Sequence, residues 1–347
     1  METDPLSDAL HGFSATGPEY STDGLSNHGP MVVEVLDQLG RPDAIENWMA
    51  GYRSRLDPAP PPAQKPLGEG EWPHALGENA TYPEWLMLFE TEMADRPVAA
   101  VVGEWVPRLL PGAVGAATHG LIRTAHGLRG LHKADTPPRR LEVATGLAYW
   151  ASQYQELPGP PLLIGHQDVP AALADLPYLP EETPEEGNIS ARVAHVADIS
   201  DEFEQAVASL GHSGDAVSLI DALALGGARA YLRNADGGHV VALIHSITAP
   251  LALELVLPWL APEDRDAALG YAWQAVASIH VAYDIHRQGG PESDDALPSR
   301  EALIELALES GDAHALKVTE AALRSFDRTG ASDLLRVAAD AVRRLSD

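Results

Sequence analysis

Helical spacing of apolar residues is the feature that most restricts how this chain can fold. Ile45, Trp48, Met49 and Tyr52 follow one another at intervals of three and four residues, which places them on one stripe of a helix. Similar spacing recurs along most of the chain. The strict alternation of apolar and polar residues that half-buried strands need is hard to find. The sequence therefore predicts an all-α, multi-helix, bundle-like fold.

The same periodicity locates the helices and the loops between them. We expect helices near residues 32–39, 45–56, 83–94, 97–110, 112–131, 138–155, 200–210, 215–234, 238–256, 263–287, 299–310, 312–327 and 331–345. Two proline-rich segments, 57–82 and 157–198, cannot be continuous helix. We interpret both as long loops of a single domain, 1–347. As the alternative, the second segment would separate two helical domains.

Charge and composition exclude several classes of partner and site. The 51 acidic residues outnumber 23 basic ones, giving a formal charge of -28, which opposes nucleic acid and anionic membrane surfaces. No apolar run approaches the roughly 20 residues of a membrane span. The acidic start, Met1–Asp4, lacks the features of a signal peptide, so we expect a cytoplasmic protein. The chain has no cysteine, which excludes disulfides and thiolate metal sites.

The motifs of several common enzyme classes are absent. The sequence has no glycine-rich dinucleotide fingerprint after a strand, no phosphate-binding loop ending in Gly-Lys, and no His-Glu-x-x-His zinc motif. The nucleophile elbow of serine hydrolases is also missing. Nicotinamide-cofactor binding, NADPH included, therefore has no support from a motif.

Four histidines lie where neither a loop nor a solvated face explains them well. His28 precedes a predicted helix, His119 lies in a helix of small residues, His245 ends the apolar run 240–244, and His314 follows the helix cap Asp312. Neutral imidazole is the commonest protein ligand of transition metals, and its donors can come from separate helices. The alternative for each is a buried histidine with an ordinary hydrogen bond.

Lys317 adds a second unusual group beside His314. It is one of only three lysines and lies three residues after His314, so the two side chains share a helix face. One interpretation is a surface lysine paired with Glu320. The other is a buried amine that desolvation keeps neutral and that can add carbon dioxide to form an anionic carbamate ligand. The spacing leaves both open.

At these residues the chain resembles the questin oxidase-like family. The matching strings are Asn27-His28-Gly29-Pro30-Met31, Thr118-His119-Gly120-Leu121-Ile122-Arg123-Thr124-Ala125-His126, His245-Ser246-Ile247-Thr248, and His314-Ala315-Leu316-Lys317-Val318-Thr319-Glu320-Ala321. The second and fourth strings are the specific ones. The resemblance implies a non-haem iron oxygenase that opens anthraquinone-type rings, in a Baeyer–Villiger-like or dioxygenase reaction.

The resemblance also implies a set of ligands. The iron(II) ion would be held by His28, His119, His245, His314 and a carboxylated Lys317, which leaves one octahedral position for dioxygen or the aromatic substrate. His126 and His280 are reserve ligands.

Two residues near these ligands are candidates for handling the substrate. His126 suits a catalytic or substrate-binding role better than the same metal. Arg123 could hold an anionic phenolate oxygen, or simply pair with a carboxylate. The competing functions are a zinc- and carbamate-dependent hydrolase and a non-catalytic helical binding protein.

Overall fold

The chain is predominantly helical, which confirms the predicted all-α class. The computed structural model describes residues 4–22, 24–185, 187–286 and 297–346. Within them the strands form one short antiparallel hairpin, β1 (Glu19–Tyr20) with β2 (Leu25–Ser26). The chain divides into two compact units: unit 1 is Met1–Glu156 with Leu255–Ala261, and unit 2 is Leu157–Glu254 with Pro262–Asp347. The single-domain assignment stays a prediction.

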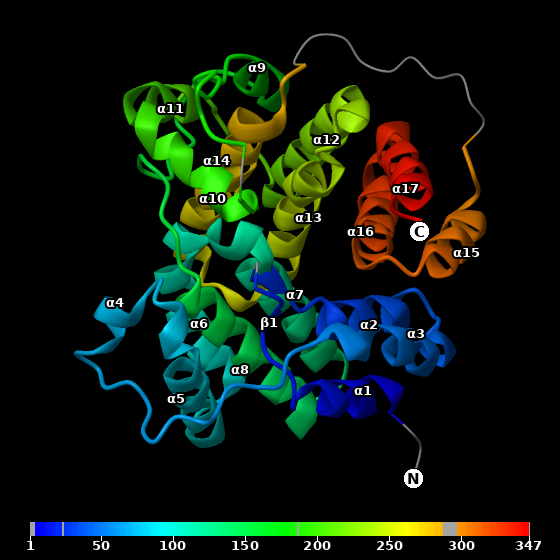
Figure 1. Cartoon of the computed structure of the whole chain (residues 1–347). Coiled ribbons are helices and arrows are strands. Elements are labelled where there is room, and N and C mark those ends of the chain that lie inside the picture. Colours follow the sequence, from blue (N-terminus) through cyan, green and yellow to red (C-terminus); the bar gives the residue numbers. More distant parts are fainter. Residues whose placement is uncertain (1–3, 23, 186, 287–296, 347) are drawn as a thin grey trace. The chain divides into compact units, whose positions relative to one another are not determined.

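Unit 1 contains the hairpin and the first eight α-helices. They are α1 (Pro5–Phe13), α2 (Gly29–Gln38), α3 (Ile45–Tyr52), α4 (Trp72–Ala75), α5 (Tyr82–Asp95), α6 (Val98–Leu109), α7 (His119–Lys133) and α8 (Pro137–Ser152) (Figure 1). Proline stands in the first turn of α1, α2, α5 and α8, where its missing N–H costs nothing. The first proline-rich segment is the connector between α3 and α5, interrupted by the single turn of α4.

Helices α7 and α8 pack unusually closely because glycines line their contact. A Cβ atom added at Gly120 would lie 2.5 Å from the Cα of Trp150, and one added at Gly146 would lie 2.9 Å from the Cα of Thr124. Distances this short are not tolerated between real atoms, so both positions require glycine. The close approach fixes α7, and with it His119 at the first position of that helix.

We expect Gly146→Val to destabilise the protein by about 2 kcal/mol, because overpacking a tight helix contact forces both backbones apart. Gly51 is the matched control, since it is an exposed helical glycine with no atom within 4 Å of an added Cβ. Gly51→Ala should instead stabilise by about 0.5–1 kcal/mol. Urea denaturation of both variants measures the difference. Equal stability of Gly146→Val and the parent would show that the two helices are free to separate.

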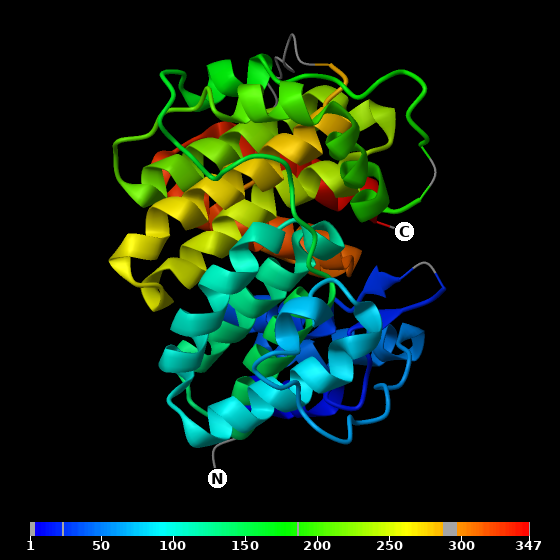
Figure 2. The ribbon, with the colours of Figure 1, turned by 90° about the vertical axis from the view of Figure 1, so that its left-hand side faces the viewer.

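Unit 2 contains the remaining helices, several of which lie side by side. They are α9 (Val169–Ala174), α10 (Ile189–Ala194), α11 (Ser200–Val207), α12 (Ala216–Asn234), α13 (Val240–Val256), α14 (Arg265–Tyr283), α15 (Arg300–Ser310), α16 (Ala313–Thr329) and α17 (Ser332–Leu345), with α13 running into the segment of unit 1. Helices α12 and α14 contact each other, as do α16 and α17 (Figures 1 and 2).

One helix corrects the expectation that no apolar run approaches the length of a membrane span. Val240–Trp259 is 20 residues long with a mean hydropathy of 2.0, enough by length and composition to cross a membrane. However, 78% of its apolar window is buried inside the protein. A core helix meets the same test, so the finding is weak support for a span.

The other departures from the predicted elements have local causes. The helix predicted at 112–131 is broken, because Ala116, Ala117 and Thr118 all have positive φ angles of 48°, 52° and 69°. Helix α1 and the hairpin were not predicted, and the segment 157–198 holds the short helices α9 and α10. The helix predicted at 263–287 ends at Tyr283, and residue 287, like 1–3 of the acidic start, lies outside the described residues.

Candidate functional site

A left-handed turn sets the orientation of His119 in unit 1. Ala116 to Thr118 turn the chain so that the Ala116 carbonyl oxygen lies 2.6 Å from Nδ1 of His119. A carbonyl only accepts hydrogen bonds, so Nδ1 carries the proton and Nε2 of the neutral ring keeps its lone pair. Fixing the tautomer through a hydrogen bond from the other ring nitrogen is the usual arrangement of metal-binding histidines.

The Asn-His-Gly-Pro string holds His28 just as firmly. Asn27 donates to the Gly17 carbonyl at 2.9 Å and accepts from the Gly29 amide at 3.0 Å, while the His28 amide donates to the Tyr52 hydroxyl at 2.8 Å. Gly29 is required because an added Cβ would overlap the ring of Phe13. The residues of this string therefore fix the backbone from which the His28 imidazole projects.

The imidazoles of His28 and His119 meet nitrogen to nitrogen. Nε2 of His28 lies 2.8 Å from Nε2 of His119, both side chains are buried, and the rings are stacked with centroids 4.8 Å apart. Two nitrogen ligands at right angles, each about 2.0–2.1 Å from a metal, are separated by roughly 2.8–3.0 Å. The pair therefore fits two adjacent positions of one metal ion, and it also fits a single His–His hydrogen bond.

Unit 2 brings together a second pair of histidines, from α13 and α16. The rings of His245 and His314 are 5.6 Å apart and edge to face, and His245 Nδ1 lies 2.8 Å from the Val241 carbonyl. Burial, with the nearby Lys317 charge, lowers the pKa of His245 to about 3 and that of His314 well below its ordinary value. Both rings are therefore neutral at pH 7, the state that binds metals.

The spacing of Lys317 left a surface lysine and a buried amine as alternatives. The structure contains the buried amine. It is only 3% exposed, and burial lowers its pKa from 10.5 to about 7. Glu320, the partner expected for a surface lysine, accepts instead from Nε of Arg324 at 3.1 Å. Within the part of the chain that the structure describes, Lys317 forms no ion pair. A large fraction of this amine is neutral at physiological pH.

Arg123, considered as a phenolate-binding group, is paired with a carboxylate. Its Nε and Nη2 donate to the two carboxylate oxygens of Glu142 at 2.7 and 3.0 Å, and both side chains are buried. The charge of the guanidinium is thereby matched inside unit 1. Of the two roles weighed for Arg123, the structure contains the ion pair.

His126, the second catalytic candidate, belongs to a buried charge cluster of unit 1. Its Nδ1 lies 2.7 Å from a carboxylate oxygen of Glu34, which also accepts from Arg129. Burial acts to raise the pKa of Glu34, but Arg129 and His126 outweigh it and lower the pKa. A histidine oriented by a carboxylate is suited to proton transfer.

His280, a reserve ligand, belongs to a polar cluster of unit 2. It is completely buried, and its Nδ1 lies 3.2 Å from Asp284, which also accepts from Arg233 and Asn234. This cluster joins the C-terminal ends of α12 and α14. The arrangement explains the burial of His280 without a metal.

Large aromatic side chains of both units serve mainly as core. Trp150 and Trp273 are buried, and their indole N–H groups donate to the Gly112 and Val207 carbonyls. Tyr149 is buried with its hydroxyl bonded to Ser26 and Glu19, and Trp259 is half-buried. Thr248 donates to the Ile244 carbonyl one turn back, an ordinary hydrogen bond within a helix.

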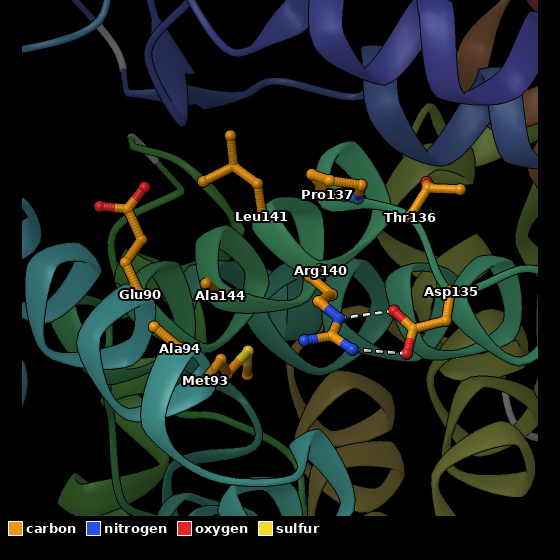
Figure 3. Close-up of a pocket in the computed structure, with 9 residues that line it drawn as sticks. All are labelled: Glu90, Met93, Ala94, Asp135, Thr136, Pro137, Arg140, Leu141 and Ala144. Atoms are coloured by element: carbon orange, nitrogen blue, oxygen red, sulfur yellow. Dashed lines mark hydrogen bonds and ion pairs between the residues drawn. The ribbon is translucent and has the colours of Figure 1, made fainter.

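An open groove of about 500 Å³ on unit 1 is separate from all these histidines (Figure 3). It lies between α5 and α8, and Arg140 pairs there with Asp135 across its rim. Both partners are largely exposed. No histidine lies among the residues that line the groove.

Sequence reasoning missed the carboxylates that support these groups. Glu34 and Glu142 are buried and bind His126 and Arg123, respectively. A signal existed for Glu34, which stands in the apolar stripe of residues 32–36 where a solvated glutamate is not expected. Glu142 gave no comparable signal, because its helix carries polar residues on several sides.

Comparison with known proteins identifies the family of the chain. A search of curated proteins finds no match. The family model described as questin oxidase-like matches residues 25–222, which include His28, His119, Arg123 and His126 but end before His245. The match covers more than half of the 347 residues. The chain therefore belongs to the questin oxidase-like family.

Proposed function

We propose that this protein is a non-haem iron oxygenase that acts with dioxygen on a polycyclic aromatic or anthraquinone-type substrate. One iron(II) ion would be held by His28 and His119 of unit 1 and by His245, His314 and a carboxylated Lys317 of unit 2. Family membership supports an oxidoreductase. The observation that carries the proposal is the meeting of two buried Nε2 atoms at 2.8 Å in unit 1.

The donor chemistry of each unit supports a shared ion. Two imidazoles in either unit are too few for a stable site of an ion that prefers four to six ligands. His28, His119 and His314 each offer a ring nitrogen to a metal ion. His119 and His245 each have Nδ1 bonded to a backbone carbonyl, which leaves Nε2 as the donor atom.

Lys317 would complete the ligand set by reacting with carbon dioxide. The lone pair of the neutral amine attacks the carbon of carbon dioxide, a nitrogen–carbon bond forms, and one proton leaves to solvent. The resulting carbamate has one negative charge and two oxygen donors. Burial favours this step because it keeps the amine unprotonated.

The remaining chemistry divides between the ion and the protein. Bound iron(II) would supply the redox chemistry that activates dioxygen. The protein orients the imidazoles, excludes water, and offers His126 for proton transfer through its hydrogen bond to Glu34. Cleavage that places both oxygen atoms in the product needs no added reductant. Insertion of a single atom, with loss of the other as water, needs two electrons from a donor such as NADPH.

The experiment that tests the proposal is elemental analysis of protein purified without chelator. We expect iron in stoichiometric amount with the chain, and oxygen uptake only when an aromatic substrate is present. His28→Ala and His245→Ala remove one donor from each unit. Because the ion is shared, either variant should lose nearly all of the iron, whereas the exposed His11→Ala should keep it.

Other results would contradict this function in distinct ways. If each variant loses only part of its iron content, the two units bind metal separately. A zinc-containing protein active without oxygen would indicate the carbamate-dependent hydrolase. A folded protein that binds no metal in any form would leave the non-catalytic binding protein.

A further inference from the structure

Unit 1 contains a cavity that none of the proposed metal ligands borders. Its volume is about 260 Å³, and it is lined by residues of α1, α5, α7 and α8 and of the proline-rich connector segment 59–63. We call it the connector cavity. An apolar cavity of about 150 Å³ holds a molecule of the size of benzene. The connector cavity therefore has room for a small bicyclic compound.

The connector beside the cavity is fastened at one end by backbone hydrogen bonds. The Ala59 amide donates to the Ala15 carbonyl at 3.0 Å, and the Gly17 amide donates to the Asp57 carbonyl at 2.9 Å. A wall held in this way keeps the cavity formed without a ligand, which lowers the entropy lost on binding.

The connector cavity adjoins the open groove of Figure 3 at two residues. Glu90 of α5 and Leu141 of α8 line both spaces. Glu90 is exposed, so the cavity meets solvent here. In Figure 3, Glu90 and the pair of Arg140 with Asp135 lie at opposite ends of the groove. Glu90 therefore stands at the mouth of the connector cavity.

Glu90 also supplies a negative charge that no neighbour balances. Arg123 pairs with Glu142 in the polar wall of the cavity, and Arg140 pairs with Asp135 in the groove. Glu90 forms no hydrogen bond or ion pair with the described residues. Burial raises the pKa of its carboxyl, and no cation offsets this effect. Among the described residues, the two spaces thus carry one unmatched negative charge, at the point where they meet.

The wall behind this charge is mainly apolar. Leu10, Phe13 and Leu86 line the cavity, as does Met87, which lies one helical turn before Glu90 in α5. Ligand pockets of this kind hold an apolar body by burial and fix its orientation through a small number of polar groups. The lining therefore favours a hydrocarbon body whose charged end points to the mouth.

The hydroxyl groups of the cavity wall already have partners. Ser14, Thr16 and Thr145 each donate to a backbone carbonyl nearby in the chain, at 2.7, 2.7 and 2.8 Å. The Tyr82 phenol is hydrogen-bonded to Thr145 and stays neutral, because burial raises its pKa to about 12. The hydroxyls offer no spare positive charge, so an anionic ligand would gain little here.

We infer that the connector cavity binds a small organic cation, with an apolar ring system inside the cavity and an ammonium group at the mouth that pairs with Glu90. An amine of one or two rings that is protonated at pH 7 has the required chemistry. The ammonium at the mouth stays partly hydrated, which avoids the cost of burying a charge. The site shares no residue with the proposed iron ligands, and the inference does not depend on whether iron binds them.

Binding of three probes of one shape to chelator-treated protein tests the inference. The probes are 2-aminotetralin, which is a cation, tetralin, which is neutral, and tetralin-2-carboxylate, which is an anion. By ligand-observed NMR titration we expect 2-aminotetralin to bind about ten-fold more tightly than tetralin, because a charged hydrogen bond is gained. The carboxylate should bind more weakly than tetralin, since Glu90 repels it. Equal affinity for 2-aminotetralin and tetralin would overturn the assignment.

Two variants of α5 separate pairing with Glu90 from the general attraction of an acidic protein for cations. Asp95 is exposed at the end of the same helix and lines neither space. Glu90→Gln and Asp95→Asn remove the same charge. The preference for 2-aminotetralin over tetralin should disappear in Glu90→Gln and remain in Asp95→Asn. A preference that survives in Glu90→Gln, or that falls equally in both variants, would exclude Glu90 as the partner.

Two matched variants of the connector locate the ring system. Ala63 lines the cavity, whereas its neighbour Gln64 is exposed and does not. Ala63→Trp should weaken 2-aminotetralin binding about ten-fold or more by filling the space, while Gln64→Trp leaves it unchanged. Thermal unfolding checks that each variant is folded. Unchanged binding in folded Ala63→Trp would place the ring system outside the cavity and refute the inference.

Discussion

Replacing Lys317 with methionine is expected to make the metal-free protein more stable at pH 7. The amine is buried, and its pKa of about 7 in the folded chain compares with 10.5 as the ordinary value. At 1.36 kcal/mol for each pH unit, the folded state loses on the order of 4 kcal/mol relative to the unfolded state at neutral pH. Methionine has a similar length, no charge, and recovers most of this energy.

The sign of the pH dependence follows from the same two pKa values. Between pH 7 and 10.5 the unfolded chain binds a proton at Lys317 that the folded chain does not, so the free energy of unfolding of the parent rises with pH in this window. The advantage of Lys317→Met should therefore shrink as the pH approaches 10.5. Chemical denaturation of chelator-treated protein in buffer free of carbon dioxide measures it. The exposed Lys65→Met is the control and should show no such dependence.

If iron binds as proposed, the same substitution should remove it from protein purified without chelator. Methionine cannot form a carbamate, so the anionic ligand would be lost while the fold gains stability. A variant that is more stable but has lost its metal shows that Lys317 serves function at the expense of stability, and not the fold. A Lys317→Met protein that keeps its iron would refute the role of the carbamate.

Replacing Glu142 with glutamine is expected to destabilise the protein by about 3–5 kcal/mol. The change leaves the buried Arg123 guanidinium without its negative partner, and an uncompensated buried charge is far more costly than a lost surface pair. Asp135→Asn, which breaks the exposed pair with Arg140 seen in Figure 3, is the control. It should have little effect, because solvent screens that pair.

Urea denaturation of Glu142→Gln and Asp135→Asn measures the loss of stability for the buried pair and for the exposed pair. A small effect of Glu142→Gln would mean that water reaches Arg123, and the polar wall of the connector cavity would then not be dry. Since the pair joins α7 to α8, the variant should also lower the cooperativity of unfolding if the contact of these helices loosens.

The helices could be predicted from sequence because each buries one periodic apolar face. The break before His119 could not, because two alanines and a threonine carry none of the usual signals for left-handed backbone. Helix α1 was missed although Leu6, Leu10 and Phe13 have helical spacing and are buried. The local sequence pattern thus predicts most helices, whereas tertiary packing sets features such as the left-handed break before His119.

The candidate site divides in the same way. The four histidines could be selected by their settings, and His28 and His119 do meet within unit 1. Spacing alone left Lys317 between a surface and a buried role, because its burial depends on what packs against α16. For Arg123 the deciding fact is the carboxylate of Glu142, 19 residues away on the next helix. Such pairings across helices are not visible in a single sequence.

The left-handed turn at Ala116–Thr118 has a consequence for how this protein can be engineered. Each of its three residues has a Cβ in a conformation that costs roughly 1 kcal/mol relative to glycine. A selection for heat resistance should therefore recover glycine at these positions. The same exchange would loosen the Ala116 carbonyl that orients His119, so thermostable clones enriched there should hold the proposed metal ion less well.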